Sequence, residues 1–240
     1  MAPSREKHRI SNMDDHITFA IGDVHGCFDK LRSLLSSCER LSAGRVAHYV
    51  LLGDYIDRGP DSRKVVEFLM MQQADFGGRF SCLRGNHEQM LIDAAANDRS
   101  DRALVNWFGN GGEETLESYE IDDPSELPPS HLKWLTALPL TVTEPDRLFV
   151  HAGLRPGIAL GEQLSADLID IREPFLSCDE IHDLFVVHGH TPTKSRRPDL
   201  RINRLNLDTG ACFGGPLTAA AFSCDRVTPL FFANSHGDVW

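Results

Sequence analysis

A short apolar run followed by a charged segment between two glycines is the feature that most constrains the fold of this chain. Tyr49–Leu52 is apolar throughout and is predicted to be a buried strand. The segment that follows, Gly53–Gly59, carries two carboxylates and a guanidinium. A helix is predicted to begin at Pro60, because proline suits the first helical position and an apolar face of helical period follows it. A strand, a charged turn and a helix in this order are typical of α/β proteins, which present chemistry at the carboxyl ends of their strands.

Four other apolar runs end in polar segments of the same kind. These runs are predicted to be strands because they are short, apolar and followed by turn residues. They are Ile17–Ile21, Phe80–Leu83, Leu148–Val150 and Phe185–His188, which precede Gly22–Gly26, Arg84–Glu88, His151–Arg155 and Gly189–Pro192. Further strands are predicted at Thr141–Thr143 and, as antiparallel strands, at Arg201–Leu207, Leu217–Phe222 and Val227–Phe232. The fold class predicted from this pattern is α/β.

The organisation of the chain favours a single domain. Its 240 residues are enough for a sizeable core, and the sequence has no internal repeat, low-complexity tract or long linker. Residues 1–16 are polar and charged and are predicted to be a disordered tail, which leaves residues 17–240 as the domain. Glycine and proline pairs interrupt the helical patterns of section 97–139, where we expect small helices that cover one side of a site.

Charge and composition exclude several classes of protein. The net charge of -11 argues against a surface that binds nucleic acid or an anionic membrane, although a local cation site can still hold phosphate. No stretch approaches the roughly 18 apolar residues of a membrane span, and the N-terminal residues lack the apolar core of a secretory signal. The six cysteines form no CxxC pair and are expected to be reduced thiols, so a cytoplasmic location is predicted.

The side chains at the five strand ends form a mixed oxygen and nitrogen ligand set. Carboxylate, imidazole and amide ligands without thiolate suit manganese, iron or zinc. A carboxylate has two oxygens, so Asp54 can bridge two ions. Asp23 and His25 would then hold one ion, while Asn86, His151 and His190 hold the other.

Five motifs together carry a resemblance to a known family. They are GDVHG (Gly22–Gly26), GDYIDRG (Gly53–Gly59), GNHE (Gly85–Glu88), HAGL (His151–Leu154) and GHTP (Gly189–Pro192). In this order the chain resembles the phosphoprotein phosphatase branch of the calcineurin-like metallophosphoesterases, and in particular its short bacterial and phage serine/threonine phosphatases. The resemblance implies two packed mixed β-sheets flanked by helices, in four layers α/β/β/α. Many other metallophosphoesterases carry GHxH, whereas Pro192 stands at the last of these positions here, which favours the phosphatase branch.

The resemblance also implies a role for each matching residue. Asp23, His25 and Asp54 match the ligands of the first metal, and Asp54, Asn86, His151 and His190 match those of the second. His87 matches the general acid, and Asp57 the carboxylate that orients it. The implied cofactor is a pair of divalent ions, with Mn²⁺ favoured over Fe or Zn, and a metal-bound hydroxide as the nucleophile. Three arginines match phosphate-binding positions: Arg58, Arg84 and, in less distinctive surroundings, Arg172.

The function implied is hydrolysis of phosphomonoesters on a phosphorylated protein, at serine or threonine and by extension tyrosine. Small phosphate esters are substrates of the same kind, and neither nucleic acid nor a membrane is expected as a partner. Two alternatives stay open, since the motifs fix only the phosphate end of the substrate. One is a phosphoanhydride hydrolase of the diadenosine tetraphosphate type, and the other is an inactive scaffold that binds phosphorylated partners. The sequence leaves open the oligomeric state, a metal contact by His188, and whether Arg155 reaches the site.

Overall fold

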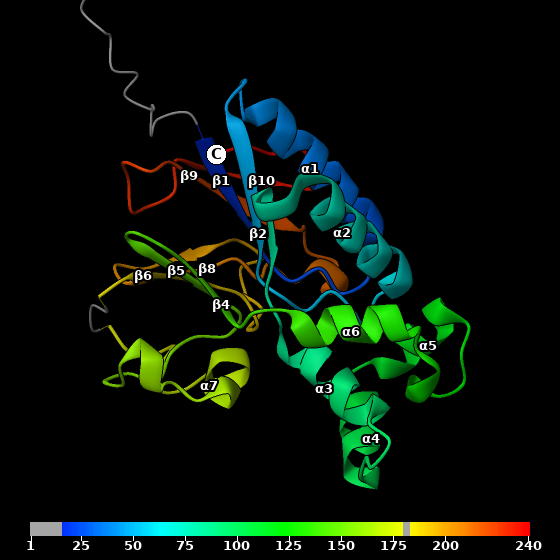
Figure 1. Ribbon diagram of the computed structural model, residues 1–240. Coiled ribbons are helices and arrows are strands. Elements are labelled where there is room, and N and C mark those ends of the chain that lie inside the picture. Colours follow the sequence, from blue (N-terminus) through cyan, green and yellow to red (C-terminus); the bar gives the residue numbers. More distant parts are fainter. Residues whose placement is uncertain (1–15, 180–182) are drawn as a thin grey trace, which may run out of the picture.

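Two five-stranded β-sheets form the centre of the computed structural model, which describes residues 16–179 and 183–240 (Figure 1). The strands of the first sheet are β1 (His16–Ile21), β2 (Val46–Leu51), β3 (Phe80–Cys82), β9 (Thr218–Phe222) and β10 (Phe231–Asn234). The strands of the second sheet are β4 (Thr141–Glu144), β5 (Arg147–Val150), β6 (Phe185–His188), β7 (Asp199–Leu200) and β8 (Arg204–Asn206). The strand orders are β10-β9-β1-β2-β3 and β4-β5-β6-β8-β7.

Each sheet contains a parallel core with antiparallel strands beside it. In the first sheet, β1 pairs parallel with β2 and β2 with β3, while β9 is antiparallel to both β1 and β10. In the second sheet, β5, β6 and β8 are parallel, and β4 and β7 are antiparallel edge strands. Because parallel strands run in one direction, the segments that follow β1, β2 and β3 meet at one edge, and those that follow β5 and β6 do the same.

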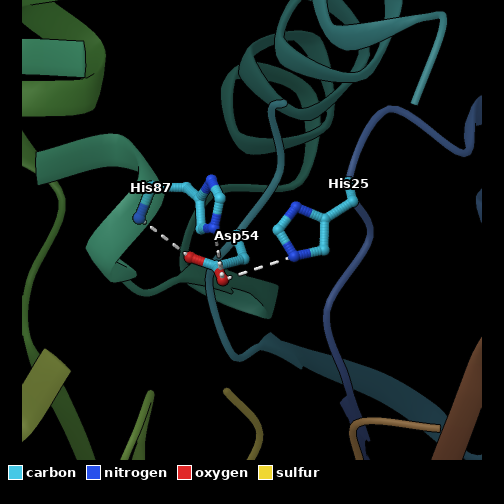
Figure 2. A group of neighbouring side chains, drawn as sticks. All are labelled: His25, Asp54 and His87. Carbon is cyan, nitrogen blue, oxygen red and sulfur yellow. Dashed lines mark hydrogen bonds and ion pairs between the residues drawn. The ribbon is translucent and has the colours of Figure 1, made fainter. Parts of the chain in front are cut away.

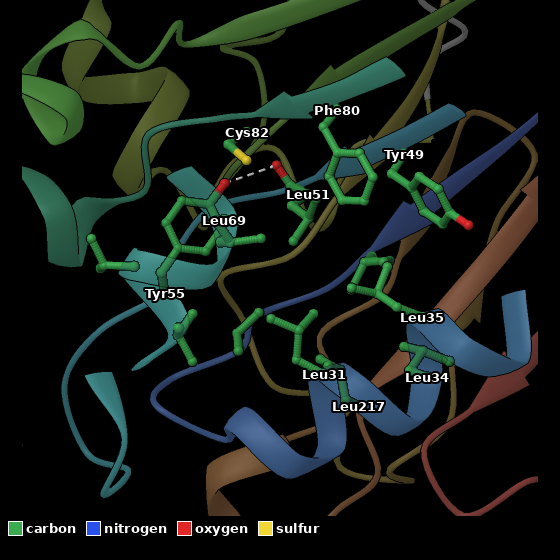
Figure 3. Packing of buried hydrophobic residues seen from close by; sticks show 14 of the residues in the cluster. Leu31, Leu34, Leu35, Tyr49, Leu51, Tyr55, Leu69, Phe80, Cys82 and Leu217 are labelled. Atoms are coloured by element: carbon green, nitrogen blue, oxygen red, sulfur yellow. Dashed lines mark hydrogen bonds between the residues drawn. The ribbon is translucent and has the colours of Figure 1, made fainter. Parts of the chain in front are cut away.

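Apolar layers on both faces of the sheets account for the uninterrupted apolar strands. Helices α1 (Phe28–Leu41) and α2 (Ser62–Phe76) cover the outer face of the first sheet (Figure 3). Leu31, Leu34, Leu35 and Cys38 recur at helical spacing and form the buried stripe of α1. A second apolar cluster, which includes Val50, Phe149 and Phe222, fills the space between the sheets. Helix α7 (Ser165–Asp170) covers the outer face of the second sheet.

Small helices occupy most of the section between residues 97 and 139. They are α4 (Asp101–Phe108), α5 (Gly112–Tyr119), the 3₁₀ turn η2 (Pro124–Glu126) and α6 (Pro129–Ala137), and they lie beside α3 (Asn86–Ala95) (Figure 1). Gly112 allows α5 to approach α4, because a Cβ there would lie 2.5 Å from the ring of Trp107. The remaining 3₁₀ turns are η1 (Gly77–Arg79), η3 (Leu160–Glu162) and η4 (Ala211–Phe213).

The structure confirms the predicted fold class and corrects several details. Strand β8, expected to be antiparallel, runs parallel to β6 and antiparallel only to β7. Strand β10 begins at Phe231, four residues later than predicted, after a turn that contains Pro229, which cannot donate to a ladder. Helix α2 begins at Ser62 and not at Pro60. Most of the predicted tail lies outside the described residues, but His16 belongs to β1. Within the described ranges, no helix is long and apolar enough to span a membrane.

Candidate active site

The carboxylate of Asp54 is the centre of the site. Its side chain is buried in the turn after β2, and three imidazoles surround it. The distance from Nε2 of His25 to Oδ2 is 3.4 Å, and that from Nε2 of His87 is 3.9 Å (Figure 2). On the other side, Nε2 of His151 lies 3.3 Å from Oδ1. One carboxylate therefore faces side chains that come from both sheets.

A second group of side chains meets at the amide of Asn86, the first residue of α3. Its Oδ1 lies 3.0 Å from Nε2 of His151 and 3.0 Å from Nδ1 of His190. Two sets of potential ligand atoms follow, and Asp54 belongs to both: His25, Asp54 and His87 form one set, and Asp54, His151 and His190 form the other. Within each set the ligand atoms lie within 4.8 Å of one another.

The protonation of two imidazoles suits a bound cation. Nδ1 of His25 lies 2.8 Å from the carbonyl oxygen of Ile56, and Nδ1 of His151 lies 2.8 Å from that of Leu52. A carbonyl accepts only, so each Nδ1 donates, and in the neutral imidazole that binds a metal each Nε2 carries the lone pair on the side of Asp54. His151 Nε2 and Asn86 Oδ1 then face each other as two acceptors. Buried acceptors that converge without a donor between them fit a metal ion.

The position of His190 also fits this interpretation. Its Nε2 is buried without a hydrogen-bond partner among the described residues and lies 3.6 Å from Oδ1 of Asp170. Its Nδ1 faces Asn86 and the second ligand set. Burial and the nearby His151 lower the pKa of His190 to about 3, which keeps the imidazole neutral, as a metal ligand must be.

Electrostatic coupling across the site is strong because the groups are buried. Burial opposes the charged form of His151, but Asp54 outweighs it and raises the pKa of His151 to about 10. Burial likewise opposes ionisation of Asp54, but His151 and His87 hold its pKa well below the usual range. In the absence of metal, an imidazolium therefore compensates the buried carboxylate. A divalent cation would replace that positive charge.

Asp23, predicted as a ligand, follows β1 and lies beside the GHTP loop. Its carboxylate accepts the backbone N–H of His190 at 3.0 and 3.2 Å. Burial and the neighbouring carboxylate of Asp208 raise the pKa of Asp23 well above its usual range. A pair of buried carboxylates with raised pKa values marks a place where positive charge is favoured. His25 adopts φ 43°, so Asp23 and His25 lie in a turn and not on an extended chain.

The backbone of the site is held in an unusual conformation. His25, Asp54, Asp57, Arg58 and His190 all have positive φ, between 43° and 69°. Such angles are uncommon for residues with a Cβ and are retained where surrounding contacts enforce them.

Two glycines explain how the turns come so close together. A Cβ at Gly85 would lie 2.2 Å from Oδ1 of Asp54, and one at Gly189 would lie 2.0 Å from Oδ1 of Asp23. Glu88 braces the same turns, because its carboxylate accepts the backbone N–H groups of Asp54, Tyr55 and Gly85 at 2.7–2.8 Å. The glycines and Glu88 thus fix the positions of the acidic side chains.

His87 and Asp57 form a buried pair beside Asp54. Nδ1 of His87 lies 2.6 Å from Oδ2 of Asp57, and both side chains are at most 1% exposed. Trp107 Nε1 donates to both oxygens of Asp57 at 3.1 Å, and the Thr115 hydroxyl donates to Oδ1 at 2.7 Å. Burial opposes the charge on His87, but Asp54 and Asp57 outweigh it and raise its pKa. The surroundings therefore favour the protonated form of an imidazole that lies next to the central carboxylate.

The predicted phosphate-binding arginines occupy different positions. Arg58 and Arg172 line a cavity of about 310 Å³ over Asp54, together with Asn86, His87 and His190. Arg58 Nη1 donates to Nε2 of His25 at 2.8 Å, and its guanidinium lies over the ring of Phe213 at 5.3 Å.

The structure places Arg84 outside the lining of this cavity. Its guanidinium donates to Gln89 Oε1 at 3.0 Å and to the carbonyl oxygens of Thr136 and Leu138. Gln89 itself lines the cavity, so Arg84 lies behind it. Two residues outside the motifs also stay away from the ligand sets: His188 lies against Phe175, and Arg155 pairs with Asp167 at 2.6 Å.

Sequence reasoning missed three residues of the site. Trp107 and Thr115 come from α4 and α5, which belong to the small helices between residues 97 and 139; we call these helices the helical cover. Asp170 ends α7 and lines the cavity. The motifs contain none of them, and their side chains reach the site only because α4, α5 and α7 pack against the strand ends. An aromatic or hydroxyl residue in a helix gives no sequence signal of such a contact.

Comparison with known proteins agrees with the fold and the site. The chain belongs to the calcineurin-like phosphoesterase family, whose model matches residues 18–221. It is 30% identical over 232 residues to "Serine/threonine-protein phosphatase 1" of Salmonella typhimurium, a match that covers 92% of this chain and 98% of that protein. It is also 29% identical over 138 residues to "Bis(5'-nucleosyl)-tetraphosphatase, symmetrical" of Vibrio vulnificus, which covers 58% of this chain and 45% of that protein.

Solved structures show the same fold. One is described as a putative diadenosine tetraphosphatase, with a TM-score of 0.66, 21% identity, and coverage of 96% of this chain and 93% of that one. A second, the cold-active protein-tyrosine phosphatase of a psychrophilic Shewanella species, has a TM-score of 0.62, 19% identity, and coverage of 94% and 81%. The family and its phosphatase relatives make this chain a metal-binding hydrolase of phosphoester bonds.

Proposed function

We propose that this chain is a phosphoprotein phosphatase that acts on phosphoserine and phosphothreonine, and that it also accepts phosphotyrosine. The observation that carries the proposal is the match to a serine/threonine-protein phosphatase over nearly the whole length of both chains. The match to the tetraphosphatase of Vibrio vulnificus covers less than half of that protein. It is therefore weaker support for a dinucleotide substrate of this chain. The proposed location is cytoplasmic, in agreement with the reduced cysteines expected from the sequence.

The proposed metal centre holds two divalent ions, with Mn²⁺ favoured. Asp23, His25 and Asp54 would hold one, and Asp54, Asn86, His151 and His190 the other. When bound, the ions would supply Lewis-acid charge for the phosphate and lower the pKa of water. The two triads that share Asp54 support the assignment of His25, Asp54, His151 and His190, and Asp23 belongs to neither triad. His87 belongs to one triad by distance, but its Nδ1 is tied to Asp57, which supports the role of a proton donor.

His87 is the proposed general acid. An alkoxide is a poor leaving group, so a serine or threonine product requires a proton as the bond to phosphorus breaks. Asp57 fixes the ring through Nδ1 and favours its charged form, which leaves Nε2–H on the side of the central carboxylate. Trp107 and Thr115 fix Asp57 in turn. The chain thus provides an imidazole whose protonated form is favoured and whose ring is held in place by Asp57.

Arg58 and Arg172 are the proposed phosphate ligands, since both line the cavity over Asp54. A guanidinium offers a planar set of donors that matches phosphate oxygens. Arg58 now donates to Nε2 of His25, the same lone pair that a metal ion would take. A cation bound there would release Arg58 towards the phosphate. Arg84 is also a proposed phosphate ligand. It lies behind Gln89, and its guanidinium donates to Gln89 and to the backbone carbonyl of Leu138.

Hydrolysis of diadenosine tetraphosphate is the second candidate function. The similarity to bis(5'-nucleosyl)-tetraphosphatases and to the solved putative diadenosine tetraphosphatase favours it. Both reactions require the same ions and the same phosphate ligands, so the site alone does not separate them.

One experiment separates the two candidates. Metal-stripped protein is restored with Mn²⁺, and initial rates are measured on a phosphoserine peptide and on diadenosine tetraphosphate. A higher kcat/KM on the peptide is expected. A higher value on the dinucleotide would replace the proposed substrate and leave the metal-site assignments unchanged. Asp54→Asn is the control, and it should abolish both activities.

A further inference from the structure

A second cavity lies directly beyond the loop that carries His190. It has a volume of about 450 Å³, and its lining includes Leu176, Thr191, Lys194, Arg201 and Arg204. Thr191 follows His190, and the N–H of Leu176 donates to the carbonyl of Arg172 at 2.8 Å. His190 and Arg172 line the cavity over Asp54. The two cavities are therefore neighbours, and we name the second one the basic cavity.

The charge of the basic cavity is opposite to that of the protein as a whole. Residues 194–204 contain five basic side chains, those of Lys194, Arg196, Arg197, Arg201 and Arg204, and one acidic side chain, Asp199, in a chain of net charge -11. Arg196 donates to the carbonyls of Phe213 and Gly214, which anchors this segment to η4. Asp199 is paired with Arg201 at 2.9 Å and with Arg204 at 3.4 Å. The lining keeps a net positive charge, because Lys194, Arg201 and Arg204 outnumber Asp199.

The wall of the basic cavity contains a buried arginine. Arg204 is 4% exposed, and it donates to the carbonyl oxygen of Leu176 at 2.9 Å. Its Nε has no hydrogen-bond partner among the described residues, and neither has Oγ1 of Thr193, which lines the same cavity. Buried polar atoms without partners are rare in native proteins, and two potential donors in one wall point to a ligand that carries oxygen acceptors. Asp199 offsets part of the cost of burying the charge of Arg204, and a further anion in the cavity would offset more.

The chemistry of the lining favours a polypeptide over a nucleotide. The described lining residues include hydroxyl, proline and cationic side chains but no aromatic ring on which a base could stack. Strand β7, which carries Asp199, is the last strand in the order of its sheet. Its outer edge offers backbone donors and acceptors that an extended peptide can use. Leu200 and Ile202 are 46% and 74% exposed beside this edge.

We propose that the basic cavity binds the acidic residues that flank the phosphorylated residue of a polypeptide substrate. An extended peptide advances about 3.3 Å per residue, so a peptide with its phosphate over Asp54 would bring carboxylates a few residues away to Lys194 and Arg201. This assignment rests on the proposed phosphoprotein phosphatase function and narrows its substrate class. The net positive lining attracts these carboxylates, and the edge of β7 aligns the chain.

The test compares two phosphoserine peptides of equal length, one with aspartates on both sides of the phosphoserine and one with alanines. The variant is the double substitution Lys194→Gln and Arg201→Gln. Its matched control is Lys133→Gln with Arg226→Gln, which removes the same charge from exposed residues elsewhere. We expect the wild type and the control to prefer the acidic peptide by about three- to tenfold in kcat/KM at low salt. The variant should lose this preference and keep its activity on p-nitrophenyl phosphate.

A binding measurement separates failure of the inference from failure of the proposed function. A fluorescent, unphosphorylated aspartate-rich peptide is titrated into the full chain at low salt and followed by anisotropy. Binding that weakens in the variant and at higher salt supports the assignment even if phosphopeptides are poor substrates. Absence of binding, or equal binding by the variant, overturns it. A loss of activity by the variant on diadenosine tetraphosphate alone would also overturn the polypeptide assignment. A lack of hydrolysis of any phosphopeptide, with binding intact, would overturn only the proposed function.

Discussion

The two halves of the site differ in how completely their side chains are enclosed. His87 lies 2.6 Å from Asp57, which accepts hydrogen bonds from Trp107 and Thr115, and the side chains of His87 and Asp57 are at most 1% exposed. Around His190, the neighbours are exposed: the side chain of Asp170 is 65% exposed, and Arg172 lies at the surface. The enclosed half is suited to hold a proton donor in place, since its geometry does not depend on the substrate. The open half is suited to admit the substrate.

Asp54 joins the two halves, and its replacement should have the largest effect. Asp54→Asn removes the charge shared by both ligand sets while it keeps the shape of the side chain. We expect the loss of both ions, and a fall in turnover well beyond the roughly 10–100-fold typical for a partner of a metal ligand. Calorimetric titration with Mn²⁺ measures the sites, and the same titration of Asp75→Asn, an exposed residue of α2 outside both sets, is the control. A variant that still bound two ions would contradict a shared carboxylate.

The enclosed half can be tested by the removal of one donor. Trp107→Phe deletes the N–H bond to Asp57, and Trp134→Phe deletes an N–H bond to Gln73 at 2.7 Å, away from the site. We expect Trp107→Phe to lower the free energy of unfolding by about 2 kcal/mol, because a buried carboxylate loses a donor. It should also reduce turnover on a phosphoserine peptide, whereas Trp134→Phe should affect stability alone. Denaturant unfolding and initial rates measure both. Equal turnover of the two variants would show that the cover does not position Asp57.

A substitution in the open half should have a smaller effect on metal binding than the substitution of Asp54. Asp170→Asn removes the carboxylate 3.6 Å from Nε2 of His190, and a carboxylate in this position is expected to help orient an imidazole that binds metal through Nδ1. The contact is 3.6 Å long and exposed to solvent, so we expect only about a tenfold loss of Mn²⁺ affinity at one of the two sites. Asp170→Glu should restore part of it. Titration with Mn²⁺ distinguishes this outcome from the loss of both sites, and an unchanged affinity would leave Asp170 without a role at the metal.

The smallest effect is expected from an ion pair at the rim. Arg155 lies 2.6 Å from Asp167 and holds the pKa of that carboxyl below its usual range. A lowered folded-state pKa means that the pair stabilises the protein above the unfolded pKa of about 3.9 and that this contribution is lost as the pH falls below it. The difference in melting temperature between wild type and Asp167→Asn should therefore be small at pH 6 and shrink further as the pH falls below about 3.9. A difference that grew as the pH fell would contradict this sign.

The sequence predicted which strand-end side chains come together better than it predicted their surroundings. His25, Asp54, His151 and His190 could be expected to meet because each follows an apolar strand and has a residue type that can bind metal. The contacts of Trp107, Thr115 and Asp170 depend on how α4, α5 and α7 pack, and the spacing of residues in the sequence does not show this packing. Arg84 stays a predicted phosphate ligand, and the sequence did not show that its guanidinium contacts the carbonyl oxygens of Thr136 and Leu138. The parallel direction of β8 was missed for the same reason, since strand pairing is a property of the assembled sheet.

The leaving-group dependence of His87→Asn tests the central claim most directly. The wild type and the variant are assayed with Mn²⁺ on a phosphoserine peptide, which has a poor leaving group, and on p-nitrophenyl phosphate, which has a good one. We predict a loss of roughly 10²–10⁴-fold on the peptide and a much smaller loss on the aryl ester, because p-nitrophenolate departs without a proton. Equal losses on both substrates would contradict the assignment of His87 as the proton donor.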